Sequence, residues 1–185
     1  MQALRKDKLY TYDDYCKWED AERCELIDGE IYGMAPAPMW THQDAIGNLY
    51  GQLWQFLKGK PCKVFTSPFD VRLNASTRDN TVLQPDIVVI CDRSKLKGTG
   101  CVGAPDMVIE ILSTSTKKYD REDKFDQYLQ AKVREYWIVD PDSNTVTVNI
   151  LDDKRYCSTD YCETDKAPVH VLEGCIIDLA DVFAG

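Results

Sequence analysis

The chain has 185 residues, of which 44% are hydrophobic and 29% are charged, a balance that indicates one globular domain and excludes a disordered or membrane-embedded chain. Its net charge of −9 argues against broad, nonspecific affinity for nucleic acid, because phosphate binding depends on lysine and arginine. The charge does not exclude an enzyme with one locally basic cleft, or with acids compensated by a metal ion.

Hydropathy and cysteine usage indicate where the protein resides. No apolar run approaches the roughly 18 residues that a membrane-spanning helix needs, and the first residues lack the apolar core of a signal peptide. The eight cysteines form no C-x-x-C pair, and two histidines are too few for typical zinc-ligand spacing. We therefore expect a cytoplasmic protein with reduced, mostly buried thiols, and with Cys157 and Cys162 in an exposed loop.

The first 40 residues predict a short helix and a hairpin. In the segment 11–22, Thr11 is a suitable amino-terminal cap for a helix with Tyr12, Tyr15 and Trp18 at helical spacing. Further on, the Asp28-Gly29 dipeptide between two apolar arms is a strong signal for a two-residue turn. Glu25 and Glu30 flank this turn, where acids usually face solvent.

The segment 41–57 predicts the clearest helix. Thr41 is the expected cap, and Gly59 is expected to end the helix. His42 falls in the first turn, where a histidine is more often a structural hydrogen bonder than a catalyst. The expected apolar face consists of Ile46, Leu49, Tyr50, Leu53, Trp54 and Leu57.

The centre of the chain predicts a mixed sheet. Segments 62–73 and 83–92 are expected to be antiparallel neighbours, because the loop between them is too short for a crossover helix. Segment 105–113 is almost continuously apolar and should be a central strand. A helix over 119–132, strands over 135–140 and 145–151, and a final short strand and helix complete a mixed α/β fold.

Three side chains in this central region suggest a catalytic site. Asp86 follows a proline and precedes the apolar run IVVI, and Glu110 interrupts the apolar run VIEIL. A carboxylate buried without a partner costs several kcal/mol, so Glu110 needs a metal ion or a cation nearby. Lys124 lies on the following predicted helix. Two acids on adjacent strands and a nearby lysine are the minimum set for a magnesium-dependent phosphodiester hydrolase.

The motifs resemble a known superfamily. The segments PDIVVI and PDMVIEILSTST, and a D-x-x-x-K-x-x-x-Y helix leading into EYWIVDP, are similar to the PD-(D/E)XK superfamily and, more narrowly, to the Uma-type endonucleases. The resemblance covers about residues 10–183. It implies a restriction-endonuclease-like core of helix, three strands, helix and strand. We accordingly expect one domain over 1–185, with an extension over 1–40, the nuclease core over 41–150 and a terminal strand and helix over 151–185.

The resemblance also implies roles for residues. Asp86 and Glu110 would ligate Mg²⁺, with Mn²⁺ possible, and Glu30, or with less support Glu25, would add an acid to the metal site. The superfamily pattern calls for a lysine two residues after the second acid, where this chain has leucine, so the role passes to Lys124. DNA would be the substrate, and a homodimer would reach both strands.

Other interpretations remain open from the residues. Asp86 could simply begin a strand, Glu110 and Lys124 could form a salt bridge without a metal, and Lys124 could pair with Asp120 one helical turn away. The competing function is a catalytically inactive module that binds DNA or a protein partner. Asp70 could support the site, and Lys117, Lys118 and Arg121 could contact phosphate or form a solvated cluster.

Overall fold

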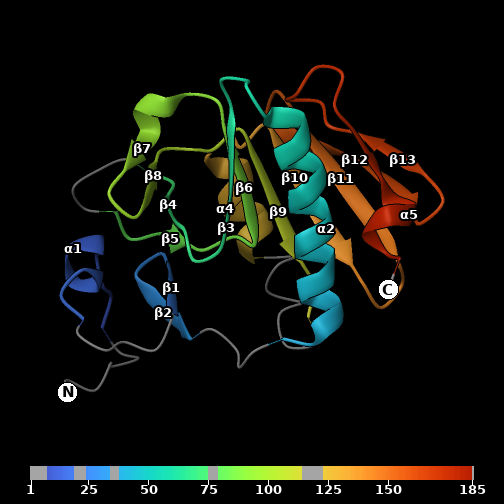
Figure 1. The fold of residues 1–185 in the computed structure, drawn as a ribbon. Coiled ribbons are helices and arrows are strands. Elements are labelled where there is room, and N and C mark those ends of the chain that lie inside the picture. Colours follow the sequence, from blue (N-terminus) through green and yellow to red (C-terminus); the bar gives the residue numbers. More distant parts are fainter. Residues whose placement is uncertain (1–7, 19–23, 34–37, 75–78, 114–122, 185) are drawn as a thin grey trace.

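The computed structural model describes residues 8–18, 24–33, 38–74, 79–113 and 123–184. Two six-stranded sheets, a two-stranded ribbon and the long helix α2 (Trp40–Leu57) dominate this part of the chain (Figure 1). The mixed α/β fold expected from the sequence is confirmed.

The larger sheet is the core of the molecule. Its order is β12-β11-β10-β9-β6-β3. The strands are β3 (Lys63–Thr66), β6 (Ile87–Ile90), β9 (Met107–Ile111), β10 (Glu135–Asp140), β11 (Thr145–Asp152) and β12 (Arg155–Cys162). All five residues of β9 are buried, and the strand lies between β6 and β10, which confirms the predicted central strand.

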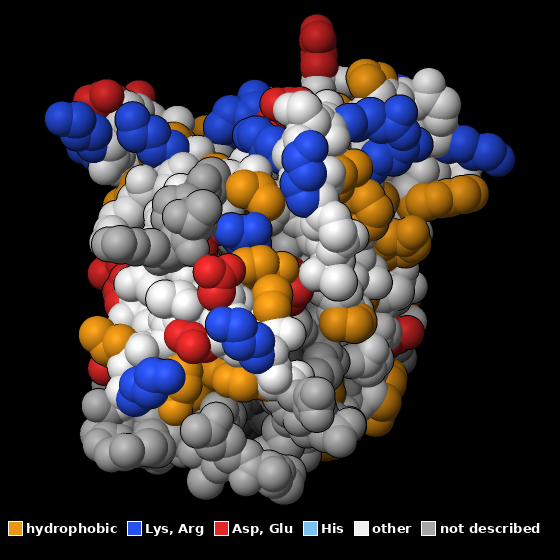
Figure 2. All heavy atoms as spheres, turned by 90° about the vertical axis from the view of Figure 1, so that its left-hand side faces the viewer, with side chains coloured by type: hydrophobic (Ala, Val, Ile, Leu, Met, Phe, Trp, Pro, Cys, Tyr) orange, Lys and Arg blue, Asp and Glu red, His pale blue; other side chains and the backbone are white. Residues whose placement is uncertain are grey.

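The smaller sheet holds the amino-terminal hairpin, in the order β2-β1-β5-β4-β8-β7. The strands are β1 (Cys24–Ile27), β2 (Glu30–Gly33), β4 (Asp70–Arg72), β5 (Val82–Leu83), β7 (Leu96–Lys97) and β8 (Gly100–Val102). The remaining elements are α1 (Tyr12–Tyr15), the 3-10 turn η1 (Arg93–Lys95), α4 (Asp123–Gln130), β13 (Lys166–Pro168), β14 (Ile176–Asp178) and α5 (Leu179–Val182). Figure 2 views this side of the molecule, where many Lys and Arg side chains gather along the upper edge and charged side chains of both signs lie lower down.

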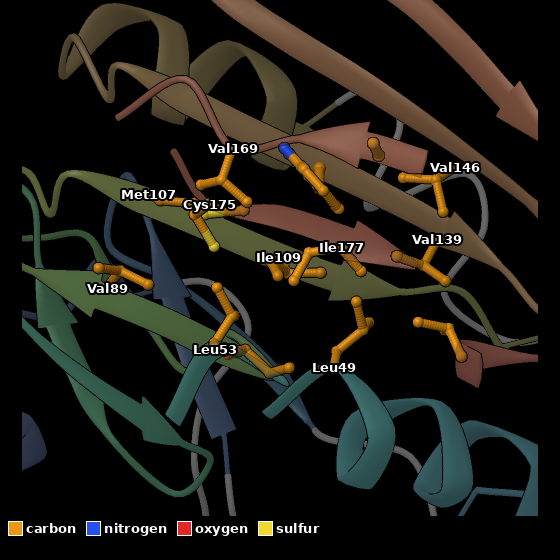
Figure 3. Packing of buried hydrophobic residues seen from close by; sticks show 14 of the residues in the cluster. Leu49, Leu53, Val89, Met107, Ile109, Val139, Val146, Val169, Cys175 and Ile177 are labelled. Carbon is orange, nitrogen blue, oxygen red and sulfur yellow. The ribbon is translucent and has the colours of Figure 1, made fainter. Parts of the chain in front are cut away.

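The two faces of the larger sheet are covered differently, because alternate residues of a strand point to opposite faces. On one face, Leu49 and Leu53 of α2 pack with Ile109 of β9 (Figure 3). On the other face, Val108 of β9 packs with Tyr128 of α4. No helix in the described part of the chain is long and apolar enough to cross a membrane.

Helix α2 differs from its prediction in two details. Within the described residues its amino-terminal cap is Met39, without a side-chain capping bond, so the expected Thr41 cap is wrong. Trp54 is 47% exposed, because the buried stripe follows Ala45, Leu49, Leu53 and Leu57 at a spacing of four residues. This spacing leaves Trp54 beside the stripe instead of on it.

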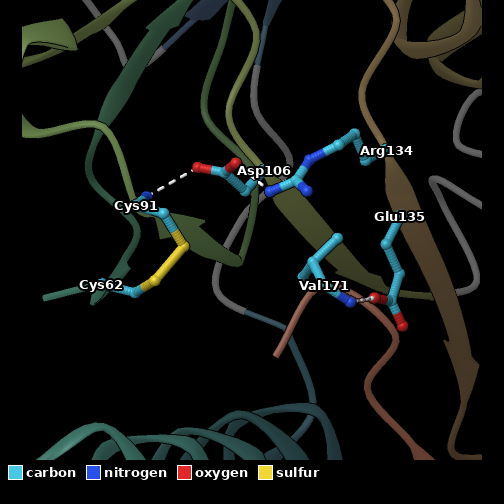
Figure 4. Close-up of a disulfide and its surroundings, with 6 residues drawn as sticks. All are labelled: Cys62, Cys91, Asp106, Arg134, Glu135 and Val171. Atoms are coloured by element: carbon cyan, nitrogen blue, oxygen red, sulfur yellow. Dashed lines mark hydrogen bonds and ion pairs between the residues drawn. A yellow bond between two sulfur atoms is a disulfide. The ribbon is translucent and has the colours of Figure 1, made fainter. Parts of the chain in front are cut away.

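The cysteine expectation is wrong in two respects. Cys62 and Cys91 form a disulfide (Figure 4), because the antiparallel pairing of Lys63 with Ile90 places the two cysteines opposite each other. Asp106 accepts a 2.6 Å hydrogen bond from the Cys91 N–H at the same place. Cys157 and Cys162 are exposed as expected, but they lie in strand β12 and not in a loop. This edge strand has no aliphatic residue, and only Tyr156 and Tyr161 are partly buried, so apolar alternation did not reveal it.

Candidate active site

The proposed acids Asp86 and Glu110 come from the same end of the larger sheet, which we call the site end. Strand β6 runs antiparallel to β9, and β10 runs parallel to β9, so β6 begins where β9 and β10 end. Ile87 pairs with Ile109, so Asp86, the residue before Ile87, lies opposite Glu110, the residue after Ile109. This end is the lower end of β9 in Figure 1, where α2 begins.

Glu110 is held by two side chains of α4. The carboxylate is only 3% exposed and lies on the sheet face that α4 covers. Lys124 Nζ is 3.0 Å from Glu110 Oε1, and the Tyr128 hydroxyl donates a 2.8 Å hydrogen bond to the same oxygen. Lys124 and Tyr128 are four residues apart, so one face of the helix presents both. The structure therefore brings together the acid and the lysine that the sequence singled out.

Tyr128 is a neutral donor in this contact. Burial, and then the charge of Glu110, raises the pKa of the Tyr128 hydroxyl well above its ordinary value. The hydroxyl therefore keeps its proton at any pH near neutrality and continues to donate to Glu110.

Glu25 is a second acid on Lys124, and it comes from the hairpin. Its carboxylate oxygen lies 3.2 Å from Lys124 Nζ and accepts a 2.7 Å hydrogen bond from the Gln84 N–H. Glu25 is 4% exposed, so the expectation of a solvent-facing position beside the turn is wrong for this residue. The reason is the pairing of β1 with β5, which buries all four residues of β1. Glu30, on β2, is exposed, and its metal-binding role stays a prediction.

The carboxylate of Asp86 has different partners. Oδ2 accepts a 2.8 Å hydrogen bond from the Ile111 N–H and lies 3.4 Å from Nε2 of His42 on α2. Asp86 therefore contacts the α2 side of the sheet, whereas Glu110 contacts α4. His42 thus contacts a proposed site residue, and its structural role stays a prediction.

A polar network supports the site from the smaller sheet. Gln84 Nε2 donates 3.0 Å hydrogen bonds to Asp70 Oδ1 and to the Tyr15 hydroxyl. The Thr99 hydroxyl donates to Asp70 Oδ2 at 2.8 Å. Burial, and then the charge of Asp70, raises the pKa of Tyr15. The network fixes Gln84, two residues before Asp86. Tyr15, Gln84 and Thr99 carry no signal in the sequence, whereas Asp70 was expected to support the site.

The carboxylates suit a hard cation such as Mg²⁺. Within the described residues there is no group of three or more His, Cys, Asp or Glu side chains arranged to hold a metal ion. Mg²⁺ is commonly bound through one or two carboxylates, with waters and substrate phosphate completing its ligands. Asp86 and Glu110 occupy opposed positions of neighbouring strands, but their carboxylates contact different helices, so a shared metal-binding role stays a prediction. Asp120, Lys117, Lys118 and Arg121 lie outside the described residues.

A solved structure identifies the class of fold. The structure is similar to the crystal structure of a protein described as a putative nuclease belonging to DUF820, from Anabaena variabilis. The TM-score is 0.75 with 21% sequence identity, covering 94% of this chain and 97% of that chain. This likeness places the chain among proteins with the restriction-endonuclease-like fold.

The family follows from the sequence comparison. The chain belongs to the Uma2 family, whose model carries the description "Putative restriction endonuclease" and matches residues 11–180. Two uncharacterized proteins of Synechocystis sp. are relatives, each 29% identical. The first matches over 160 residues, covering 83% of this chain and 81% of its own length. The second matches over 145 residues, covering 76% of this chain and 80% of its own length.

Proposed function

We propose that the protein is a metal-dependent endonuclease that hydrolyses DNA phosphodiester bonds at the site end of the larger sheet. The observation that carries the proposal is the buried pair of Glu110 and Lys124, with Asp86 opposite Glu110 on the next strand. Family membership and the fold support nuclease chemistry in general.

Asp86 and Glu110 would hold Mg²⁺, or Mn²⁺ in its place. The ion would supply Lewis-acid stabilisation of the phosphoryl oxygens and a more acidic water. Lys124 would orient the attacking water and stabilise the negative charge that develops on the phosphorane-like transition state. Glu25, on strand β1 of the hairpin, also pairs with the Lys124 ammonium and helps to hold it in place. Tyr128 fixes the orientation of Glu110.

DNA as the substrate rests on the family description, and a homodimer rests on resemblance alone. With a net charge of −9, the protein must bind DNA through local charge and not through its overall field. A dimer would place two such sites on the two strands of a duplex.

A second candidate function has a specific observation in its favour. Both acids have partners within the chain: Asp86 has the Ile111 N–H and His42, and Glu110 has Lys124 and Tyr128. These contacts satisfy the carboxylates without any metal ion. A catalytically inactive module that binds DNA or a protein would need no more than this.

Calorimetric titration of Mg²⁺ and Mn²⁺, with plasmid nicking on the same samples, separates the two candidates. We expect metal binding and nicking in the wild type, and loss of both in Glu110→Gln and Asp86→Asn. Glu173→Gln, at an exposed position, is the control and should behave as wild type. Glu30→Gln tests whether Glu30 also contributes to metal binding. A folded wild type that binds neither metal would favour the inactive module.

A further inference from the structure

A small pocket lies beside the amino terminus of α2. It has a volume of about 180 Å³, and its lining includes Trp40, Asp44, Pro141, Asn144 and Phe183. Pockets for drug-sized ligands span roughly 300–1,000 Å³, so this pocket suits one small ring system and not a whole nucleotide.

The pocket shares the site end of the sheet with the proposed acids. Trp40 is two residues before His42, whose ring contacts Asp86. On the other side, Pro141 directly follows β10, and β10 ends beside the end of β9, where Glu110 lies. The pocket therefore lies on the α2 side of the site end, the side that the Asp86 carboxylate contacts.

The exposed aromatic ring is the unusual feature of this pocket. Trp40 is 63% exposed, and Met39 before it is 70% exposed. An indole ring is a large flat apolar surface, and a flat aromatic face is the platform on which proteins stack unpaired bases. An enzyme that acts on nucleic acid gains affinity from such a platform without reading sequence.

We propose that this pocket binds an unpaired nucleobase of the substrate strand, stacked on Trp40, with the Asp44 carboxylate accepting hydrogen bonds from the edge of the base. This inference rests on the proposed function, because that function makes the nucleic-acid strand the substrate.

The chemistry of the lining selects a base and not a phosphate. An ionised carboxylate only accepts hydrogen bonds, and it repels an anion, so Asp44 requires a partner with N–H donors. Guanine presents two adjacent donors, N1–H and N2–H, on its Watson–Crick edge, and should be preferred. Asp44 is held in place by a 3.4 Å hydrogen bond from Asn48 Nδ2, one helical turn further along α2.

The adjoining helix terminus favours the backbone phosphate next to such a base. Helix α2 has 18 residues and no acidic residue in its first turn. Its N-cap residue, Met39, makes no side-chain capping hydrogen bond, and the first N–H groups of a helix carry partial positive charge and attract anions. A base in the pocket and its phosphate beside the helix terminus would account for both features.

Binding of single-stranded decamers of dG, dA, dC and dT, measured in EDTA by fluorescence anisotropy and tryptophan quenching, tests the proposal without any cleavage. We expect Trp40→Ala to weaken binding about 5- to 150-fold, the range measured for removing one stacking aromatic ring. Trp40→Phe should retain most of the affinity, and Asp44→Asn should abolish the preference for dG. The control is Trp54→Ala, an exposed tryptophan on the same helix about 21 Å away, which should leave binding unchanged.

The outcomes separate this inference from the proposed function. Equal binding by Trp40→Ala and Trp54→Ala overturns the pocket, even if the wild type cleaves plasmid. Binding of dG that depends on Trp40 supports the pocket, even if the wild type cleaves nothing. A wild type that sediments as a dimer, with a monomeric Trp40→Ala, would assign the pocket to a second copy of the chain and overturn the proposal.

Discussion

At the scale of single residues, the determining feature is one buried cation between two buried acids. Lys124 is 5% exposed and lies 3.0 Å from Glu110 and 3.2 Å from Glu25. Removing three charged groups from water costs several kcal/mol for each ion, and close pairing offsets that cost only when further donors satisfy the oxygens. Tyr128 and the Gln84 N–H supply those donors.

Replacing Lys124 with an uncharged residue should therefore destabilise the folded protein. We expect Lys124→Met to lower the free energy of unfolding by about 3–5 kcal/mol, because the ammonium that pairs with both buried carboxylates is removed. Urea unfolding measures this change. Lys166→Met removes an exposed pair with Asp178 and should change stability little. Equal effects in the two variants would contradict the buried-pair account.

A double variant isolates the pair itself. Glu110→Gln combined with Lys124→Met should cost less than the sum of the two single changes, because removing Glu110 also removes one of the stranded charges. Strict additivity in the same urea measurement would mean that the two side chains do not interact.

The sequence revealed part of this arrangement. Glu110 was recognisable because an acid within VIEIL needs a partner, and Lys124 because the family resemblance, with leucine at the usual lysine position, passes that role to the following helix. Glu25 was not recognised, because an acid beside an Asp-Gly turn is normally solvated. Only the pairing of β1 with β5 buries it, and that pairing joins segments far apart in the chain.

At the scale of elements, the β1–β2 hairpin matters because it supplies Glu25. Its turn was predicted correctly from Asp28-Gly29, and both residues have positive φ, 51° and 84°. Gly29 also lies close to the chain before it: a Cβ there would be 3.0 Å from the Leu9 Cβ and 3.1 Å from the Tyr10 carbonyl oxygen. Turn geometry and close packing both require glycine at this position.

Gly29→Ala should therefore destabilise the protein by about 1–3 kcal/mol, through the strained φ and the contact with residues 9 and 10. Thermal and urea unfolding give the value. Gly33→Ala in the same hairpin is the matched control, because Gly33 lacks positive φ and no atom lies within 4 Å of an added Cβ. Similar losses in both variants would show that hairpin glycines matter only through chain flexibility.

The disulfide between β3 and the end of β6 should also stabilise the fold. It closes a loop with a sequence separation of 29, and the chain-entropy model gives about 3–4 kcal/mol for a loop of this length. We expect Cys62→Ala/Cys91→Ala to lose stability of that order, and a reducing agent to destabilise the wild type but not the double variant. Identical unfolding curves with and without reductant would show that the thiols are reduced.

At the scale of the whole molecule, burial of ionisable groups sets the response to alkali. Burial raises the pKa of Cys24 and Cys175 to about 11 and that of Cys101 to about 12, from an ordinary value near 9. Unfolded thiols lose their protons first, so the unfolded state binds fewer protons than the folded state above pH 9.

Stability should accordingly be level up to about pH 9 and fall as the pH rises from there towards 12. Urea unfolding at a series of pH values measures the slope. Cys101→Ala should reduce the slope, because it removes one of the contributing thiols. Stability that rises between pH 9 and 11 would contradict this assignment.

The attachment of Lys124 to Glu25 has a consequence for synthesis of the protein. The two residues belong to segments far apart in the chain, and contacts of long sequence separation form late in folding. A growing chain on the ribosome contains Glu25, Asp86 and Glu110 before it contains Lys124. If the proposed chemistry holds, an unfinished chain is inert, and hydrolysis begins only after helix α4 has docked against the finished sheet.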